Sequence, residues 1–199
     1  MDSFEVNRLP MPEQPCTVEQ YLEFERASEE RHEYLNGYIH LLESSNHNHS
    51  LIEGNISGAL YQQLRKTRCL LFLVAMRLHI TRTGLYTYPD ICVVCDTPQY
   101  LHDDTLLNPV LIAEVMSPTS EGHDRVNKFK HYRALESLQE CMLVDQRSAR
   151  LEHYARQPDG QWLLSDYTGL EAVLTLPSIG CTLALSDVYE KVRFEEDSE

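Results

Sequence analysis

Basic side chains are scarce in this chain. Of its 199 residues, 17 are lysine or arginine and 31 are aspartate or glutamate, which gives a formal net charge of -14. Such a balance provides no general electrostatic attraction to a polyanion and counts against a non-specific nucleic-acid binder. Contact with nucleic acid would therefore need a local basic patch, metal ions in an acidic site, or a partner.

Long apolar runs are also missing. The longest run, residues 69–76, stops at Arg77 and is far too short to span a membrane. The first residues are acidic and interrupted by proline, and they lack the apolar segment of a signal peptide. We therefore expect a cytoplasmic protein without a membrane partner.

The six cysteines have no framework spacing. Cys92 and Cys95 are the only close pair, and in a strand their side chains would point to opposite faces, which does not suit one zinc ion. We expect all six to be small buried hydrophobic residues in a reducing compartment. His47 and His49 indicate zinc only weakly, because no third His or Cys lies nearby.

The overall composition, with 42% hydrophobic and 24% charged residues, is that of an ordinary soluble globular protein. The length suits one domain, which we place at residues 17–192, between a leader at 1–16 and an acidic tail at 193–199. Strand-like and helix-like patterns follow one another, which predicts a mixed α/β class. We expect helices at 17–27, 51–64 and 122–135, hairpins around Asn36-Gly37 and residues 157–160, and one straight or bent strand over 69–80.

Two short apolar runs, residues 91–95 and 110–115, are typical of neighbouring strands, and each brings a carboxylate with it. Asp90 stands at the entrance of the first run and Glu114 lies inside the second. A buried carboxylate costs several kcal/mol unless it is paired or coordinates a metal, and two on adjacent strands would repel each other. The pattern predicts a divalent-metal site, and oxygen ligands favour Mg²⁺ (or Mn²⁺) over zinc.

A metal ion held by carboxylates at strand ends suits one kind of chemistry. It can polarise a phosphoryl oxygen and lower the pKa of a bound water, while a nearby lysine stabilises the developing negative charge or helps to deprotonate the nucleophile. The residues therefore suggest metal-assisted phosphodiester hydrolysis.

Several motifs occur together in a fixed order. They are Glu33 to Ile39 (E-Y-L-N-G-Y-I), His49-x-x-Ile52-x-x-x-Ile56, Pro89-Asp90, Glu114 to Ser120 (E-V-x-S-P-x-S), Asp124-x-x-x-Lys128 with Tyr132 after it, and Val144-Asp145. Each is weakly specific, but the series resembles the Uma2 family of the restriction-endonuclease-like PD-(D/E)XK superfamily. The resemblance covers roughly residues 17 to 192.

The resemblance implies an α/β/α nuclease core, with a central mixed β-sheet flanked by helices. Asp90 and Glu114 would be the metal-binding acids, the backbone carbonyl of Val115 a further ligand, and Glu33 an acid from the first helix region. The implied cofactor is Mg²⁺ (or Mn²⁺) and the implied substrate is DNA. A homodimer is expected by analogy, because many enzymes that cut both strands act as dimers.

One position departs from the family pattern. The lysine expected two residues after Glu114 is replaced by Met116, and Lys128 on the following helix is the expected substitute. The alternative is that Lys128 only pairs with Asp124 on a solvated helix face. His49 would either line the site or cap its helix.

Three functions stay open at this level. The first is a Mg²⁺-dependent DNA endonuclease, the second a catalytically inactive binding protein on a nuclease scaffold, and the third a metal hydrolase of a small phosphorylated substrate. Contact of Lys128 with the acids would favour catalysis. DNA would be favoured over a small substrate by a basic groove drawn from Arg77, Arg82, Arg125, Lys128 and Lys130.

Overall fold

The structure is a computed structural model that describes residues 10–42, 46–116 and 123–194. The helices are α1 (Val18–Ala27), α2 (His47–Leu64), α3 (His123–Tyr132) and α4 (Leu185–Val188). The strands are β1 (His32–Leu35), β2 (Tyr38–Leu41), β3 (Leu70–Leu73), β4 (Arg77–Ile80), β5 (Leu85–Thr87), β6 (Ile91–Val94), β7 (Tyr100–Leu101), β8 (Thr105–Leu106), β9 (Leu111–Met116), β10 (Glu140–Asp145), β11 (Arg150–Arg156), β12 (Trp162–Thr168), β13 (Val173–Leu176) and β14 (Cys181–Ala184).

The main sheet has six strands in the order β12-β11-β10-β9-β6-β3. Strands β9 and β10 run parallel and the other neighbours are antiparallel, so the sheet is mixed. Every residue of β6 and of β9 is buried, as expected for central strands covered on both faces. The apolar runs seen in the sequence are therefore the middle of the sheet.

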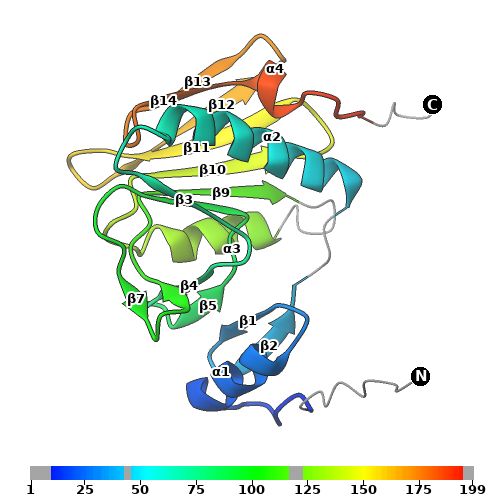
Figure 1. Cartoon of the computed structure of the whole chain (residues 1–199), viewed down its shortest axis with the longest axis vertical. Coiled ribbons are helices and arrows are strands. Elements are labelled where there is room, and N and C mark those ends of the chain that lie inside the picture. Colours follow the sequence, from blue (N-terminus) through cyan, green and yellow to red (C-terminus); the bar gives the residue numbers. More distant parts are fainter. Residues whose placement is uncertain (1–9, 43–45, 117–122, 195–199) are drawn as a thin grey trace.

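Helices cover both faces of this sheet (Figure 1). On one face, Ile52 and Ile56 of α2 pack against alternate residues of β6 and β9, together with β13, β14 and α4. On the other face, Tyr132 of α3 packs against the residues in between, and strands β4, β5 and β8 complete that layer. The expected α/β/α architecture with a central mixed sheet is confirmed.

A second sheet, in the order β2-β1-β5-β4-β8-β7, carries the N-terminal part of the chain. Its β1-β2 hairpin turns at Asn36 and Gly37, which have φ values of 52° and 91°, so the Asn-Gly prediction is confirmed. Strand β1 joins β5 through the pair Tyr34 and Tyr86. Figure 1 shows α1, β1 and β2 at one end of the molecule, at a distance from the main sheet.

The prediction of one strand over residues 69–80 is wrong. The segment divides into β3, at the edge of the main sheet, and β4, inside the second sheet. Between them the chain turns, and the N–H of Met76 donates to the carbonyl of Leu73. An apolar run gives no sign of such a turn, because both halves are β-forming and either sheet can accept them.

The expectation of six free cysteines is also wrong. Cys69 and Cys95 form a disulfide, while Cys16, Cys92, Cys141 and Cys181 are free and buried. The β3-β6 ladder pairs Leu70 with Val94, so its next step brings Cys69 opposite Cys95. The pairing joins residues 26 positions apart and depends on this register.

In the ranges that the structure describes, no helix combines the length and the apolar character needed to cross a membrane.

Candidate active site

The two carboxylates predicted from the strand pattern come from neighbouring strands. The β6-β9 ladder pairs Ile91 with Ala113, and one step further along it Asp90 is opposite Glu114. Both residues are buried, with 6% of Asp90 and 3% of Glu114 exposed. The strand register thus brings together two acids that are 24 residues apart in sequence.

Asp90 is held by groups from β9 and from α2. Its Oδ2 accepts a hydrogen bond from the backbone N–H of Val115 at 2.7 Å and lies 3.3 Å from Nε2 of His49. The N–H and C=O of one strand residue point toward the same neighbouring strand, so the Val115 carbonyl also faces the β6 side. Asn46 caps α2, since its side chain accepts from the N–H of His49. The imidazole of His49 is therefore directed to the site and does not cap the helix.

Glu114 is held from the opposite face of the sheet by α3. The hydroxyl of Tyr132 donates to Oε1, and Nζ of Lys128 lies 3.3 Å from Oε2. Lys128 and Tyr132 are one turn apart, so a single helix face supplies both groups. The Lys128 ammonium is therefore directed to the acids, on a side chain that is 24% exposed. Met116, which stands where the family pattern has lysine, is buried among apolar side chains.

Glu33 lies at the edge of this group. It is half-buried on β1, and its carboxylate accepts a hydrogen bond from the hydroxyl of Thr87, which is fully buried on β5. Its negative charge raises the pKa of Glu114 and the pKa of Lys128. It does not, however, belong to the group of described His, Cys, Asp and Glu side chains whose ligand atoms all lie within 4.8 Å of one another.

Burial and mutual repulsion dominate the electrostatics. Burial, with the charges of Asp90 and Glu33, raises the pKa of Glu114 to about 7, against the opposing effects of Lys128 and the Tyr132 hydrogen bond. Burial alone would lower the pKa of Lys128, but the surrounding carboxylates outweigh it and raise that pKa above its usual range. Lys128 is thus an ammonium ion at neutral pH and can stabilise negative charge.

Sequence reasoning missed Glu53, which lies one turn after His49 on α2. Ligand atoms of His49, Glu53 and Asp90 all lie within 4.8 Å of one another. Burial and the charge of Asp90 raise the pKa of Glu53. The i, i+4 spacing of His49 and Glu53 was available in the sequence, but nothing there linked this helix face to Asp90.

The basic residues proposed for a groove lie in different places, and Lys128 among them lies at the acids. Arg77 is buried, and its guanidinium lies 2.6 Å from the carboxylate of Asp104, so it is not available to a ligand. The side chain of Arg125 lies outside the described part of the structure. Arg82 and Lys130, however, line a hollow of about 400 Å³ beside the C-terminal end of α3. Its lining residues are Arg82, Lys130, Arg133, Ala134, Gly160 and Trp162.

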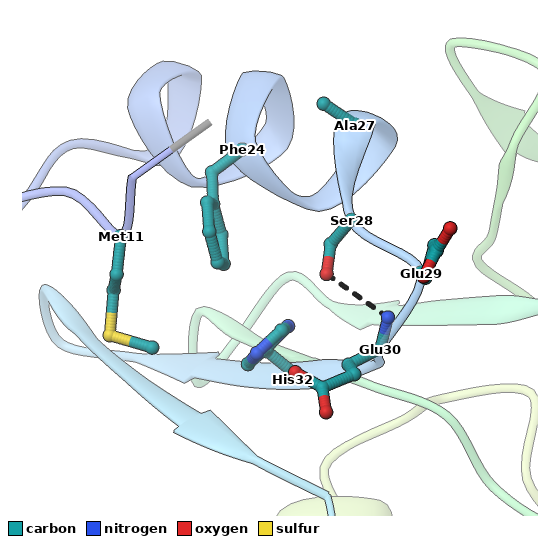
Figure 2. Close-up of a pocket in the computed structure, with 7 residues that line it drawn as sticks. All are labelled: Met11, Phe24, Ala27, Ser28, Glu29, Glu30 and His32. Atoms are coloured by element: carbon teal, nitrogen blue, oxygen red, sulfur yellow. Dashed lines mark hydrogen bonds between the residues drawn. The ribbon is translucent and has the colours of Figure 1, made fainter. Parts of the chain in front are cut away.

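A smaller hollow of about 170 Å³ lies between α1 and β1 (Figure 2). Its residues are Met11, Phe24, Ala27, Ser28, Glu29, Glu30 and His32. None of the predicted site residues borders it. The imidazole of His32 is already paired with Glu25 at 2.9 Å, so this hollow shares no group with the acids of the main sheet.

A mixed sheet between helices, with two buried carboxylates and a lysine at one end of its central strands, is typical of a restriction-endonuclease-like fold. The fold agrees with a crystal structure of a protein from Anabaena variabilis, described as a "putative nuclease belonging to DUF820". The TM-score is 0.72, at 19% identity, over 88% of this chain and 98% of the other.

The chain belongs to the Uma2 family, described as "Putative restriction endonuclease", whose model matches residues 18–186. Two proteins of Synechocystis sp. are similar along most of their length. The uncharacterized protein slr1290 is 32% identical over 93% of this chain and 96% of its own. The uncharacterized protein sll1609 is 35% identical over 78% of this chain and 89% of its own. The resemblance seen in the sequence motifs is confirmed at the level of the family.

Proposed function

We propose that this protein is a divalent-metal-dependent endonuclease that hydrolyses phosphodiester bonds of DNA. The proposal rests on one observation: Asp90 and Glu114 are opposite each other at the end of β6 and β9, with Lys128 directed to Glu114. Membership of a nuclease family supports the reaction class. The metal, the DNA substrate and the residue roles are our inference.

The donor set suits Mg²⁺ (or Mn²⁺). Carboxylate oxygens of Asp90 and Glu114, with the Val115 carbonyl, are the hard ligands that these ions prefer. The charge balance also favours a cation, because among the described side chains the acids of this region outnumber its bases. The acids are Glu33, Glu53, Asp90 and Glu114, and the bases are Lys128, His49 and Arg31.

Each residue has a distinct role in this proposal. Asp90, Glu114 and the Val115 carbonyl would hold the ion, which supplies Lewis-acid polarisation and an activated water when bound. Lys128 would stabilise the negative charge that develops on the phosphoryl group, because its pKa keeps it protonated. Glu33 would orient the water from the edge of the site through its link to Thr87.

The hollow beside α3 supports a polymeric substrate. The chain is acidic overall, yet Arg82, Lys130 and Arg133 gather there with Trp162. None of these three cations has a carboxylate partner among the residues that the structure describes. Lys130 lies on α3, the helix that also carries Lys128, and exposed cations in such a patch would attract a phosphate backbone.

The test is cleavage of supercoiled plasmid at low salt with Mg²⁺ or Mn²⁺. We expect metal-dependent nicking that is abolished in Asp90→Ala and reduced by roughly 100- to 1,000-fold in Lys128→Ala, the usual effect of removing one group that stabilises developing charge. Lys66→Ala is the matched control, because Lys66 is exposed at the end of α2.

Other outcomes would favour the alternatives. Loss of cleavage in Asp90→Ala but not in Lys128→Ala would show that Lys128 has a structural role and not a catalytic one. A wild-type protein that binds metal but cuts neither plasmid nor single strands would contradict the proposal, and would favour a binding protein on this scaffold or a hydrolase of a small phosphorylated substrate. Light scattering would test the homodimer that belongs to the same proposal.

A further inference from the structure

A second group of ligands lies on the other side of Asp90 from Lys128. His49 and Glu53 are one turn apart on α2, so their side chains share one face of that helix. With Asp90 they place three ligand atoms, from two different elements, within 4.8 Å of one another. Among the described residues, no other set of three or more His, Cys, Asp or Glu side chains meets that condition.

Two of these side chains face each other, and the third lacks a partner. The side chain of His49 is 12% exposed, and its Nε2 faces Oδ2 of Asp90. The carboxylate of Glu53 is half-buried, and no hydrogen bond or ion pair from the described residues holds it. A half-buried carboxylate beside a second, buried carboxylate is costly without a counter-charge, which a cation would supply.

The spacing suits a cation. Ligands about 2.1 Å from a metal lie roughly 3 Å apart when adjacent and roughly 4.2 Å apart when opposite. His49 Nε2 and Asp90 Oδ2, at 3.3 Å, already have the adjacent spacing. The ligand atom of Glu53 lies within 4.8 Å of both others, which is close to the spacing of opposite ligands.

A cation bound by His49, Glu53 and Asp90 does not require Glu114 as a ligand. Both of its carboxylate oxygens face α3, where Tyr132 and Lys128 hold them. A cation on the α2 side would thus leave the Lys128 contact in place and share only Asp90 with the metal position proposed above.

We propose that His49, Glu53 and Asp90 form a second divalent-cation site on the α2 side of the sheet, suited to a first-row transition ion such as Mn²⁺ more than to Mg²⁺. An imidazole ligand favours transition ions, whereas Mg²⁺ prefers oxygen and retains its waters. The inference deepens the proposed function, on which it rests for the shared role of Asp90, but cation binding can be measured without any cleavage.

The experiment uses the full chain, stripped with EDTA and titrated with Mn²⁺ in excess Mg²⁺. Electron spin echo envelope modulation detects a ¹⁴N nucleus bound to Mn²⁺, which reports a coordinating imidazole directly. We expect this signal in the wild type and in Glu114→Gln, and its loss in His49→Ala. Glu53→Gln should weaken Mn²⁺ binding by roughly 10- to 100-fold, as disturbed metal sites do.

His47→Ala is the matched control, because His47 is an exposed histidine two residues earlier on the same helix. It should change neither the signal nor the affinity. His49→Gln retains a side-chain donor to Asp90, so it separates loss of a ligand from loss of a hydrogen bond, and thermal unfolding in EDTA shows that each variant is folded.

Absence of ¹⁴N coupling in the wild type, or coupling that persists in His49→Ala, would overturn the second site. Unchanged Mn²⁺ affinity in Glu53→Gln would do the same. These failures differ from failure of the proposed function. A protein that cuts plasmid with Mg²⁺ but shows no coupling keeps the nuclease and loses this site, whereas coupling without cleavage keeps this site and loses the nuclease.

Discussion

Replacing Lys128 by methionine would test the ion pair with Glu114, which links α3 to the central strand. Methionine retains most of the apolar stem of lysine and removes its charge. In the wild type, Lys128 is the main group that lowers the pKa of Glu114, which burial and two nearby acids raise to about 7. Without Lys128, the pKa of Glu114 must rise above 7.

The magnitude follows from proton linkage. A glutamate in the unfolded chain has a pKa of about 4.3, so a higher folded pKa means that the folded state binds the extra proton. The free energy of unfolding therefore falls as pH rises from about 4.3 to the folded pKa, by about 1.4 kcal/mol per pH unit, and then levels off. For the wild type it levels off at about pH 7. For Lys128→Met it continues to fall, which gives a difference of up to ~2 kcal/mol at pH 8.5.

The assay is urea unfolding in EDTA at pH 6, 7 and 8.5. We expect the loss of stability to be smallest at pH 6, where Glu114 is largely protonated in both proteins and only Glu33 and Asp90 act on Lys128, and largest at pH 8.5. In melting temperature, each kcal/mol corresponds to roughly 2–4 °C for a domain of this size. Lys66→Met should change stability by less than about 0.5 kcal/mol at every pH. A loss in Lys128→Met that does not depend on pH would refute the reasoning.

Two further predictions follow from the other charged groups. Burial opposes ionisation of Asp104, but hydrogen bonds from Arg26 and Arg77 outweigh it and lower its pKa to about 2, so its stabilising effect is present above about pH 4 and is lost as pH falls toward 2. Asp104→Asn should therefore be less stable by about 1–2 kcal/mol in urea unfolding at pH 7, and the difference should shrink at pH 2.5; an equal difference at both pH values would contradict this. For the hollow beside α3, Lys130→Ala and Arg133→Ala should each reduce the slope of log affinity for DNA against log salt by about 1, measured with Ca²⁺ in place of Mg²⁺. An unchanged slope in both variants would show that DNA does not reach the hollow.

Much of the fold could be predicted from local patterns. The apolar runs that became β6 and β9, the Asn36-Gly37 hairpin and the helix expected at 17–27 all depend on neighbouring residues, and the structure has each of them. Asp90 and Glu114 could be selected because a carboxylate in a buried strand is anomalous wherever the strand lies. Sequence could also indicate that the residues after Glu114 return as a helix with a lysine on it.

The partners of these residues could not be predicted. The division of residues 69–80 between two sheets, the Cys69–Cys95 disulfide and the burial of Arg77 against Asp104 all depend on which strands become neighbours. A periodic pattern shows which residues share a face, but not what that face will meet.

At the site, too, the sequence predicts which residues are unusual but not which residues they contact. The sequence by itself determined that Asp90 and Glu114 are buried acids in need of a counter-charge, because that follows from the strands that contain them. Only the tertiary structure decided which side chains lie beside each acid. Glu114 is held by Lys128 and Tyr132 from one face of the sheet, and Asp90 lies beside His49 and Glu53 from the other. The physical reason is that a central strand is covered on both faces by helices distant in sequence, and long-range packing sets their positions.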